Sequence, residues 1–112
     1  MSSAVQQPSL FTDIVPVTYE RHESLDQRFD RFISTNPQVL DAFIYFAGEA
    51  QRRGRQRIGA KAIVERLRWE WLGRTEGDEF RLNNSFTSRL ARAAVARKAE
   101  LAELFEFREL RS

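Results

Sequence analysis

Apolar side chains recur at helical spacing through the first half of the chain. A first amphipathic helix is predicted over residues 22–34 by apolar positions at i, i+4, i+7 and i+8, namely Leu25, Phe29, Phe32 and Ile33. Asn36-Pro37 then suits a helix start, because Asn is a common N-cap and Pro is favoured at the first helical position. The wider apolar stripe that follows predicts a central helix over residues 37–53, buried on more than one side.

A third helix is predicted after a short basic turn. Gly54 is expected to end the central helix in the left-handed conformation. Helical spacing then resumes over residues 58–69, through Ile58, Ala60, Ile63, Val64 and Leu67.

The pattern changes to alternation after Trp69. Trp69 and Trp71 would share one face of a strand, and Thr75-Glu76-Gly77-Asp78 has the composition of a turn. These features predict a short β-hairpin, with strands at residues 70–74 and 79–82. The alternative is a helix that continues to Leu72 and is followed by an irregular loop.

Helical spacing returns in the last third of the chain. Asn83-Asn84-Ser85 supplies a helix start, and residues 85–97 and 99–105 are expected to be helical. The ending from Phe105 to Leu110 alternates like a strand, and the path of residues 98–112 is left open. The fold class predicted is mostly α with a small β-hairpin, a winged-helix-like domain. Residues 1–18 are expected to form a flexible N-terminal arm, and residues 19–112 a single domain.

Composition argues against several kinds of chemistry. The 112 residues include no cysteine and one histidine, His22, so disulfides and thiolate metal sites are excluded and a His-carboxylate metal site is not expected. No carboxylate pair, phosphate-binding glycine loop or nucleophile–base pair is recognisable. We therefore expect no enzymatic activity and no cofactor. Neither a signal peptide nor a membrane span is predicted, which favours a cytoplasmic protein without membrane contact.

Charge is distributed unevenly along the chain. The net charge of +2 combines an acidic first part with a basic centre, where residues 51–98 carry a net +8. The basic turn between the second and third predicted helices, residues 52–61, is called the elbow below. A basic surface of this kind attracts a polyanion, although it also suits a turn kept soluble by arginine.

Nucleic acid, with DNA favoured over RNA, is the partner predicted from this charge. The elbow arginines are expected to bind backbone phosphates, while Lys61 and Arg68 face bases from the third helix. The nucleic-acid-binding residues predicted are Arg52, Arg53, Arg55, Arg57, Lys61, Arg68, Arg89 and Arg92. The predicted hairpin tip is acidic, from Glu76 to Glu79, and this argues against a wing that grips phosphate.

The alternative function belongs to a different class. The chain could be a small protein–protein interaction module, such as an inhibitor of a host defence or replication protein, or could form a homodimer. Its contact residues would be Trp69 together with Phe11 and Ile14 of the N-terminal arm. The same arm could instead be a strap that covers the domain's own core.

Several segments in fixed order resemble a family of small proteins encoded by phages, prophages and plasmids. The resemblance covers about two-thirds of the chain and is carried by Asn36-Pro37, by the run from Gly54 to Ile63, by Glu65 to Glu70, and by Thr75 to Asn84. It implies a mobile-element setting and no particular mechanism. The chain departs from the family at Lys98-Ala99-Glu100, where the resemblance would lead us to expect a break containing proline.

Overall fold

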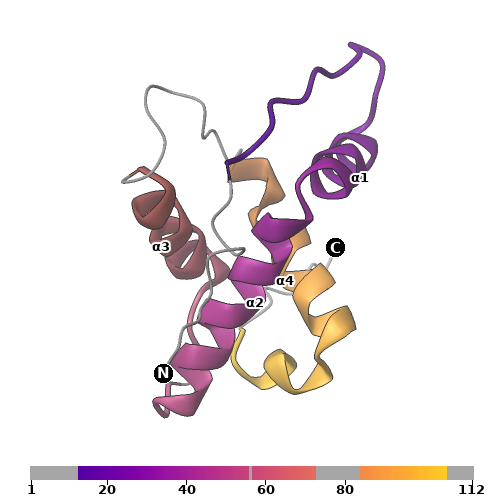
Figure 1. Ribbon diagram of the computed structural model, residues 1–112. Helices are drawn as coiled ribbons and strands as arrows, with labels where there is room; N and C mark the ends of the chain where they lie inside the picture. Colours follow the sequence, from indigo (N-terminus) through magenta and orange to yellow (C-terminus); the bar gives the residue numbers. More distant parts are fainter. Residues whose placement is uncertain (1–12, 56, 73–83, 106–112) are drawn as a thin grey trace.

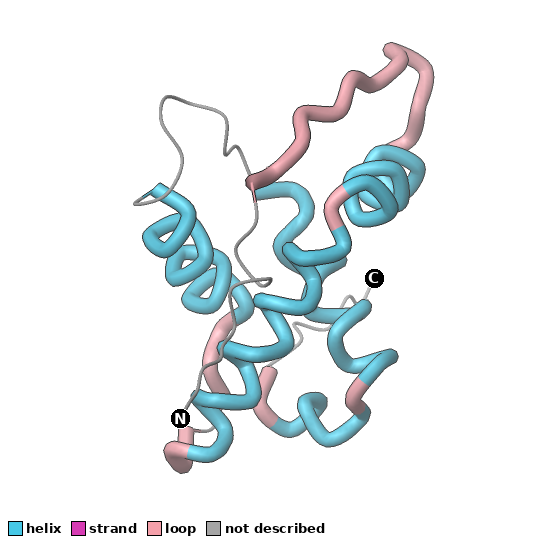
Figure 2. Tube along the Cα trace, viewed as in Figure 1, coloured by secondary structure: helices cyan, strands magenta, loops and turns pink. Residues whose placement is uncertain are grey.

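The computed structural model describes residues 13–55, 57–72 and 84–105. Within these ranges the protein is a bundle of four α-helices with two short 3-10 turns and no strand (Figures 1 and 2). The elements in chain order are α1 (Leu25–Thr35), α2 (Pro37–Arg52), α3 (Ala60–Leu72), η2 (Asn84–Phe86), α4 (Thr87–Arg97) and η3 (Ala99–Glu103).

Helix α2 occupies the centre of the bundle and contacts α1, α3, α4 and η3. Its apolar positions turn toward several neighbours at once, which explains the wide stripe in the sequence. The buried side chains of α2 are Val39, Leu40, Ala42, Phe43, Phe46 and Ala47. The prediction of a central helix buried on more than one side is confirmed.

Aromatic rings join the ends of the bundle to its centre. Phe86 of η2 packs against both Phe29 and Phe32 of α1, with ring centroids 5.4 and 5.5 Å apart. Phe105 stacks on Phe43 of α2 at 5.6 Å. Offset and edge-on ring pairs of this kind add to the burial energy. They join η2 to α1 and the segment after η3 to the central helix.

Local signals explain where the first two helices begin. Ser24 caps α1 by accepting a hydrogen bond from the backbone N–H of Gln27 at 3.1 Å, and Gln27 Oε1 accepts the Ser24 N–H in return at 2.7 Å. This capping box starts the helix at Leu25, three residues later than predicted. Pro37 stands at the first position of α2, as expected.

The predicted β-hairpin and winged-helix-like fold are wrong. Residues 70–72, expected to begin the first strand, are the last residues of α3, and the described residues contain no strand. The helix continues past Trp69 because the apolar positions Ile63, Val64 and Leu67 keep helical spacing. An ion pair between Arg66 and Glu70, four residues apart, also supports the last turn. Residues 73–83, including the second predicted strand and the turn, lie outside the described residues.

Candidate nucleic-acid interface

The elbow begins with a tight reversal after α2. Gly54 has a φ of +84°, the left-handed conformation that glycine adopts most easily. The Gly54 N–H donates to the Gln51 carbonyl, and the Arg55 N–H donates to the Ala50 carbonyl, both at 3.0 Å. These bonds satisfy carbonyls at the helix end in the manner of a Schellman motif. The predicted left-handed cap at Gly54 is confirmed.

The other half of the elbow is fixed to the C-terminal part of the bundle. The Ile58 N–H donates to the Leu104 carbonyl at 2.8 Å, and Ile58 forms a single parallel bridge with Phe105. Arg57, just before, has a φ of +55°, a conformation that costs a residue with a side chain about 1–2 kcal/mol. The bonds of Ile58 therefore hold the elbow in one backbone shape, and its side chains project from a fixed base.

Positive charge at the elbow exceeds negative charge. Glu49 accepts a hydrogen bond from Arg52 at 3.1 Å and lies 3.5 Å from Nε of Arg53. The hydrogen bond from Arg52 is the main reason that the pKa of Glu49 lies below its usual value. Arg55 and Lys61, both exposed, form no ion pair with any residue of the described ranges. Two of these four cations, Arg52 and Arg53, thus share the Glu49 carboxylate.

The two arginines of α3 are balanced by carboxylates of the same helix. Arg66 pairs with Glu70 at 3.1 Å, and Arg68 pairs with Glu65 at 2.9 Å. Each arginine of this helix therefore has a carboxylate of the same helix within reach. Lys61 has no carboxylate partner among the described residues, whereas Arg68, the other residue predicted to face bases, is paired with Glu65.

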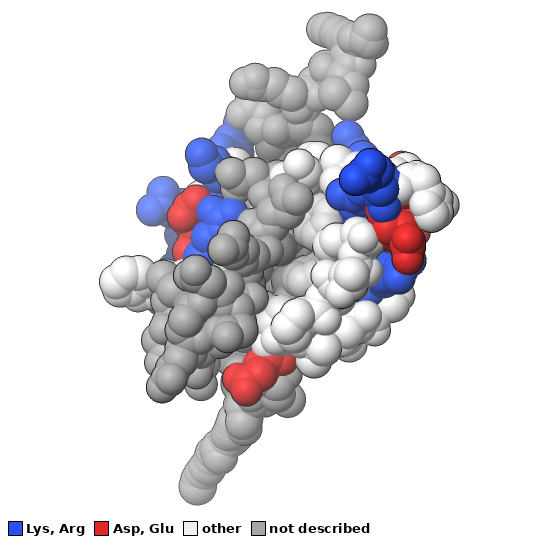
Figure 3. Space-filling model, turned by 90° about the horizontal axis from the view of Figure 1, so that it is seen from above, with Lys and Arg blue, Asp and Glu red and all other residues white. Residues whose placement is uncertain are grey.

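Arg89 of α4 does not extend the elbow surface. Nε of Arg89 donates to Asp26 of α1 at 2.6 Å, and Nη1 of Arg89 donates to the Ser85 carbonyl at 3.4 Å. This places Arg89 beside the start of α1, whereas the elbow lies beside η3. Arg92 is exposed on α4. On the face shown in Figure 3, Lys and Arg form two separate groups, each with acidic side chains beside it.

A groove opens between α2 and α3 directly above the elbow. It encloses about 770 Å³, and we call it the α2/α3 groove; its lining residues are Tyr45, Phe46, Glu49, Ala50, Arg53, Arg55, Ile58, Ala62, Ile63 and Arg66. Arg53 and Arg55 belong to both the elbow and the groove. The basic turn and the apolar hollow are therefore parts of one surface.

Aromatic side chains stand at the edge of this groove. Tyr45 packs edge-on against Phe46 with ring centroids 5.3 Å apart, yet 39% of Tyr45 is exposed. The Arg66 guanidinium lies over the Phe46 ring, 4.4 Å from its centroid. Trp69 does not line the groove itself; it follows the lining residues Ala62 and Arg66 at helical spacing on the same face of α3 and is 73% exposed. A tryptophan this exposed beside a hollow is characteristic of contact surfaces.

The residues predicted to contact a protein partner differ in their exposure to solvent. Trp69 is exposed, as that hypothesis requires. Ile14 is only 6% exposed and belongs to the protein's own core, so its side chain is not available to a partner. Phe11 lies outside the described residues.

Sequence reasoning missed Tyr45 and Glu49 as members of the site. They lie with Arg53 at i, i+4 and i+8, a polar row on α2 beside the apolar stripe. In the sequence this row is indistinguishable from an ordinary solvent-exposed helix face. Only the position of α3 shows that it borders a groove.

The described part of the chain holds no group of three histidine, cysteine, aspartate or glutamate side chains placed to bind a metal ion. None of its helices has the length and apolar character needed to cross a membrane.

No family model, curated protein or solved structure matches this chain. The resemblance to small phage, prophage and plasmid proteins therefore stays a prediction.

Proposed function

We propose that the protein binds nucleic acid through the elbow. The observation that supports this best is the charge imbalance there: Arg52 and Arg53 share the Glu49 carboxylate, while Arg55 and Lys61 are exposed and form no ion pair with the described residues. The arginine side chains are largely exposed, 64% for Arg52 and 78% for Arg53, so both can reach a ligand without rearrangement of the backbone.

Phosphate is the ligand group that suits this surface. Guanidinium groups match the oxygens of a phosphate with two parallel hydrogen bonds, and several cations in a row suit a polyanion better than a single small ion. Contacts of this kind position a nucleic acid without reading its sequence. The paired arginines of α3 agree with a backbone-binding role, since the carboxylates of Glu65 and Glu70 already occupy the guanidinium groups that would otherwise face bases.

Salt dependence tests the proposal directly. With about four phosphate contacts, the logarithm of the association constant should fall with the logarithm of salt concentration at a slope of about −3 to −4. Fluorescence anisotropy with labelled single-stranded and duplex oligonucleotides of mixed sequence measures this slope. Arg55→Gln should make it shallower by about 1, because one phosphate contact is removed.

Arg21→Gln is the matched control. Arg21 is exposed in the segment before α1, far along the chain from the elbow, and the substitution removes the same charge. It should leave the slope unchanged. Binding that is absent, or that does not respond to salt, would remove the proposal.

The second candidate function is a protein–protein interaction module, favoured by the exposure of Trp69 beside the α2/α3 groove. Exposed tryptophans next to hollows often dominate the energy of protein interfaces. A single stoichiometric protein partner that survives nuclease treatment and is lost on Trp69→Ala would support this function instead.

A further inference from the structure

The α2/α3 groove and the elbow share residues, so a ligand that is bound at one of them also lies next to the other. Arg53 and Arg55 line the groove and also belong to the basic turn. A chain whose phosphates lie on the elbow therefore has its attached groups beside an apolar hollow. In a nucleic acid those groups are the bases.

Planar side chains on which bases can stack lie in the groove and beside it. Tyr45 is held by its edge-on contact with Phe46, and Trp69 presents most of its indole to solvent. The Arg66 guanidinium adds a third planar group. The Phe46 ring covers one of its two faces. Single-stranded nucleic acids are bound by this combination of aromatic rings, arginine planes and a basic track for the backbone.

A duplex fits the same surface poorly. Bases in a duplex are stacked and paired, so they cannot enter a hollow unless they are flipped out at a cost. Reading a duplex from its major groove requires a protruding helix with free side chains. Here α3 lines a concave surface, and its arginines are paired with Glu65 and Glu70. The volume of about 770 Å³ lies within the range of hollows that take small organic groups.

From this arrangement we infer that the protein binds single-stranded nucleic acid, with phosphates on the elbow and bases stacked against Tyr45 in the α2/α3 groove and against Trp69, three residues beyond the groove-lining Arg66 on α3. The inference rests on the proposed function, because the elbow must first bind the backbone. It adds the class of nucleic acid and the residues that distinguish it from a duplex. Stacking tolerates any base, so little dependence on sequence is expected.

The test compares strands of one length in one buffer. Fluorescein-labelled oligothymidylate and oligouridylate of about 20 nucleotides, and a duplex of the same length, are titrated with the full chain and followed by anisotropy. A single strand should bind at least about tenfold more tightly than the duplex, and the better of the two strands shows whether DNA or RNA is preferred.

Two variants at one position separate stacking from charge. Trp69→Ala should weaken single-strand binding about tenfold and leave the salt slope unchanged, because a stacking contact is lost and no phosphate contact is. Trp69→Phe should recover most of the affinity, since an aromatic ring is restored. The side chain is exposed, so neither variant should disturb folding, and circular dichroism checks this.

Each failure has a distinct meaning. Equal or tighter binding of the duplex would overturn the inference, and so would an unchanged affinity after Trp69→Ala. The proposed function would still stand if Arg55→Gln makes the salt slope shallower. Displacement of the single strand by polyglutamate at equal charge concentration would also overturn it, because a polyanion without bases would then suffice. Absence of binding to all three nucleic acids would remove the proposed function as well.

Discussion

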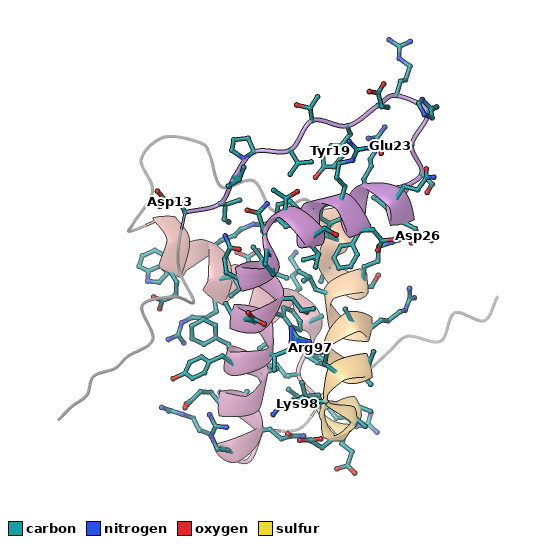
Figure 4. The ribbon with its side chains drawn as sticks, turned by 45° about the vertical axis from the view of Figure 1, so that its right-hand side comes forward. Asp13, Tyr19, Glu23, Asp26, Arg97 and Lys98 are labelled. Atoms are coloured by element: carbon teal, nitrogen blue, oxygen red, sulfur yellow. The ribbon has the colours of Figure 1, made fainter. Side chains whose placement is uncertain are left out.

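The side-chain amide of Asn36 pairs with the backbone of Val15 through two hydrogen bonds. Asn36 Oδ1 accepts the Val15 N–H at 2.7 Å, and Asn36 Nδ2 donates to the Val15 carbonyl at 3.0 Å. Asn36 is fully buried between α1 and α2, and its Nδ2 also donates to the Phe32 carbonyl at 3.3 Å. The segment from Asp13 to Glu23 thereby runs over the start of α2 and alongside α1 (Figure 4), with Ile14 in the core.

Removal of this amide should destabilise the whole bundle. Asn36→Ala leaves the N–H and carbonyl of Val15 without their partner and opens a space in the core, which should lower the free energy of unfolding by about 3 kcal/mol. Urea denaturation measures the loss. Gln38→Ala is the control, since Gln38 Nε2 also donates to this segment, at the Asp13 carbonyl, but does so near the surface. The Gln38 variant should lose less than about 1 kcal/mol; equal losses would contradict the role given to Asn36.

Alanine substitutions at Gly54 and Gly48 should change the stability of the protein in opposite directions. Gly54→Ala places a side chain at a φ of +84° and should cost about 1–2 kcal/mol, even though a Cβ there would meet no neighbour within 4 Å. Gly48→Ala, inside α2, should raise stability by about 0.5–1 kcal/mol, because alanine favours the helix. A Cβ at Gly48 would lie 3.4 Å from the flexible Arg52 side chain, which can move. Thermal unfolding of both variants measures the two shifts.

The sequence allowed the helices to be predicted because their core positions repeat at a strict helical period. Pro37 and Gly54 also act locally, one through its fixed φ and the other through its freedom at positive φ, so the ends of α2 were predictable to within a residue. The exposure of the elbow arginines followed from the same local geometry.

Features that depend on distant parts of the chain were not predictable. Asn36 looked like a helix cap, but its side chain makes no cap bond and instead holds Val15, 21 residues away. Arg89 was assigned to nucleic acid, yet its carboxylate partner Asp26 lies 63 residues earlier. The spacing of Trp69 and Trp71 predicts a strand, whereas both residues belong to α3, because two positions are too few to distinguish a period of two from a helical period.

Acid should destabilise the protein partly through Glu23. The Glu20 N–H donates to Glu23 Oε1 at 2.7 Å, and Arg31 forms an ion pair with the same carboxylate. The backbone hydrogen bond is the largest cause that lowers the pKa of Glu23 below its ordinary 4.5, followed by the interaction with Arg31. Because the folded pKa is the lower one, the contribution of Glu23 to stability is present above pH 4.5 and is lost as pH falls through the folded pKa.

The pH dependence of unfolding measures this contribution. In urea titrations below pH 4.5, Glu23→Gln should lose less stability per pH unit than the unchanged protein, since one carboxylate no longer takes up a proton. Gln keeps an oxygen that can accept the Glu20 N–H, so the substitution tests charge and not shape. Identical pH profiles for the two proteins would contradict the assignment.

Removal of the Glu49 charge is expected to tighten nucleic-acid binding. A variant with a damaged fold would bind more weakly, so a gain in affinity cannot come from misfolding. Its carboxylate binds Arg52 and Arg53, so it competes with any phosphate for both. Glu49→Gln should tighten nucleic-acid binding about threefold to tenfold at low salt and steepen the salt slope by up to about 1. Stability should change little, because exposed ion pairs contribute under about 1 kcal/mol.

Glu65→Gln shows whether the gain is local. It makes the same change in net charge and removes the carboxylate that pairs with Arg68 on α3, away from the two arginines that Glu49 binds. If phosphates lie on the elbow, anisotropy titrations at three salt concentrations should show a clearly larger gain for the Glu49 variant. Equal gains would mean that attraction to the whole protein's charge, and not contact at the elbow, governs binding. The elbow would then lose its place as the phosphate site, whatever affinity the protein itself retained.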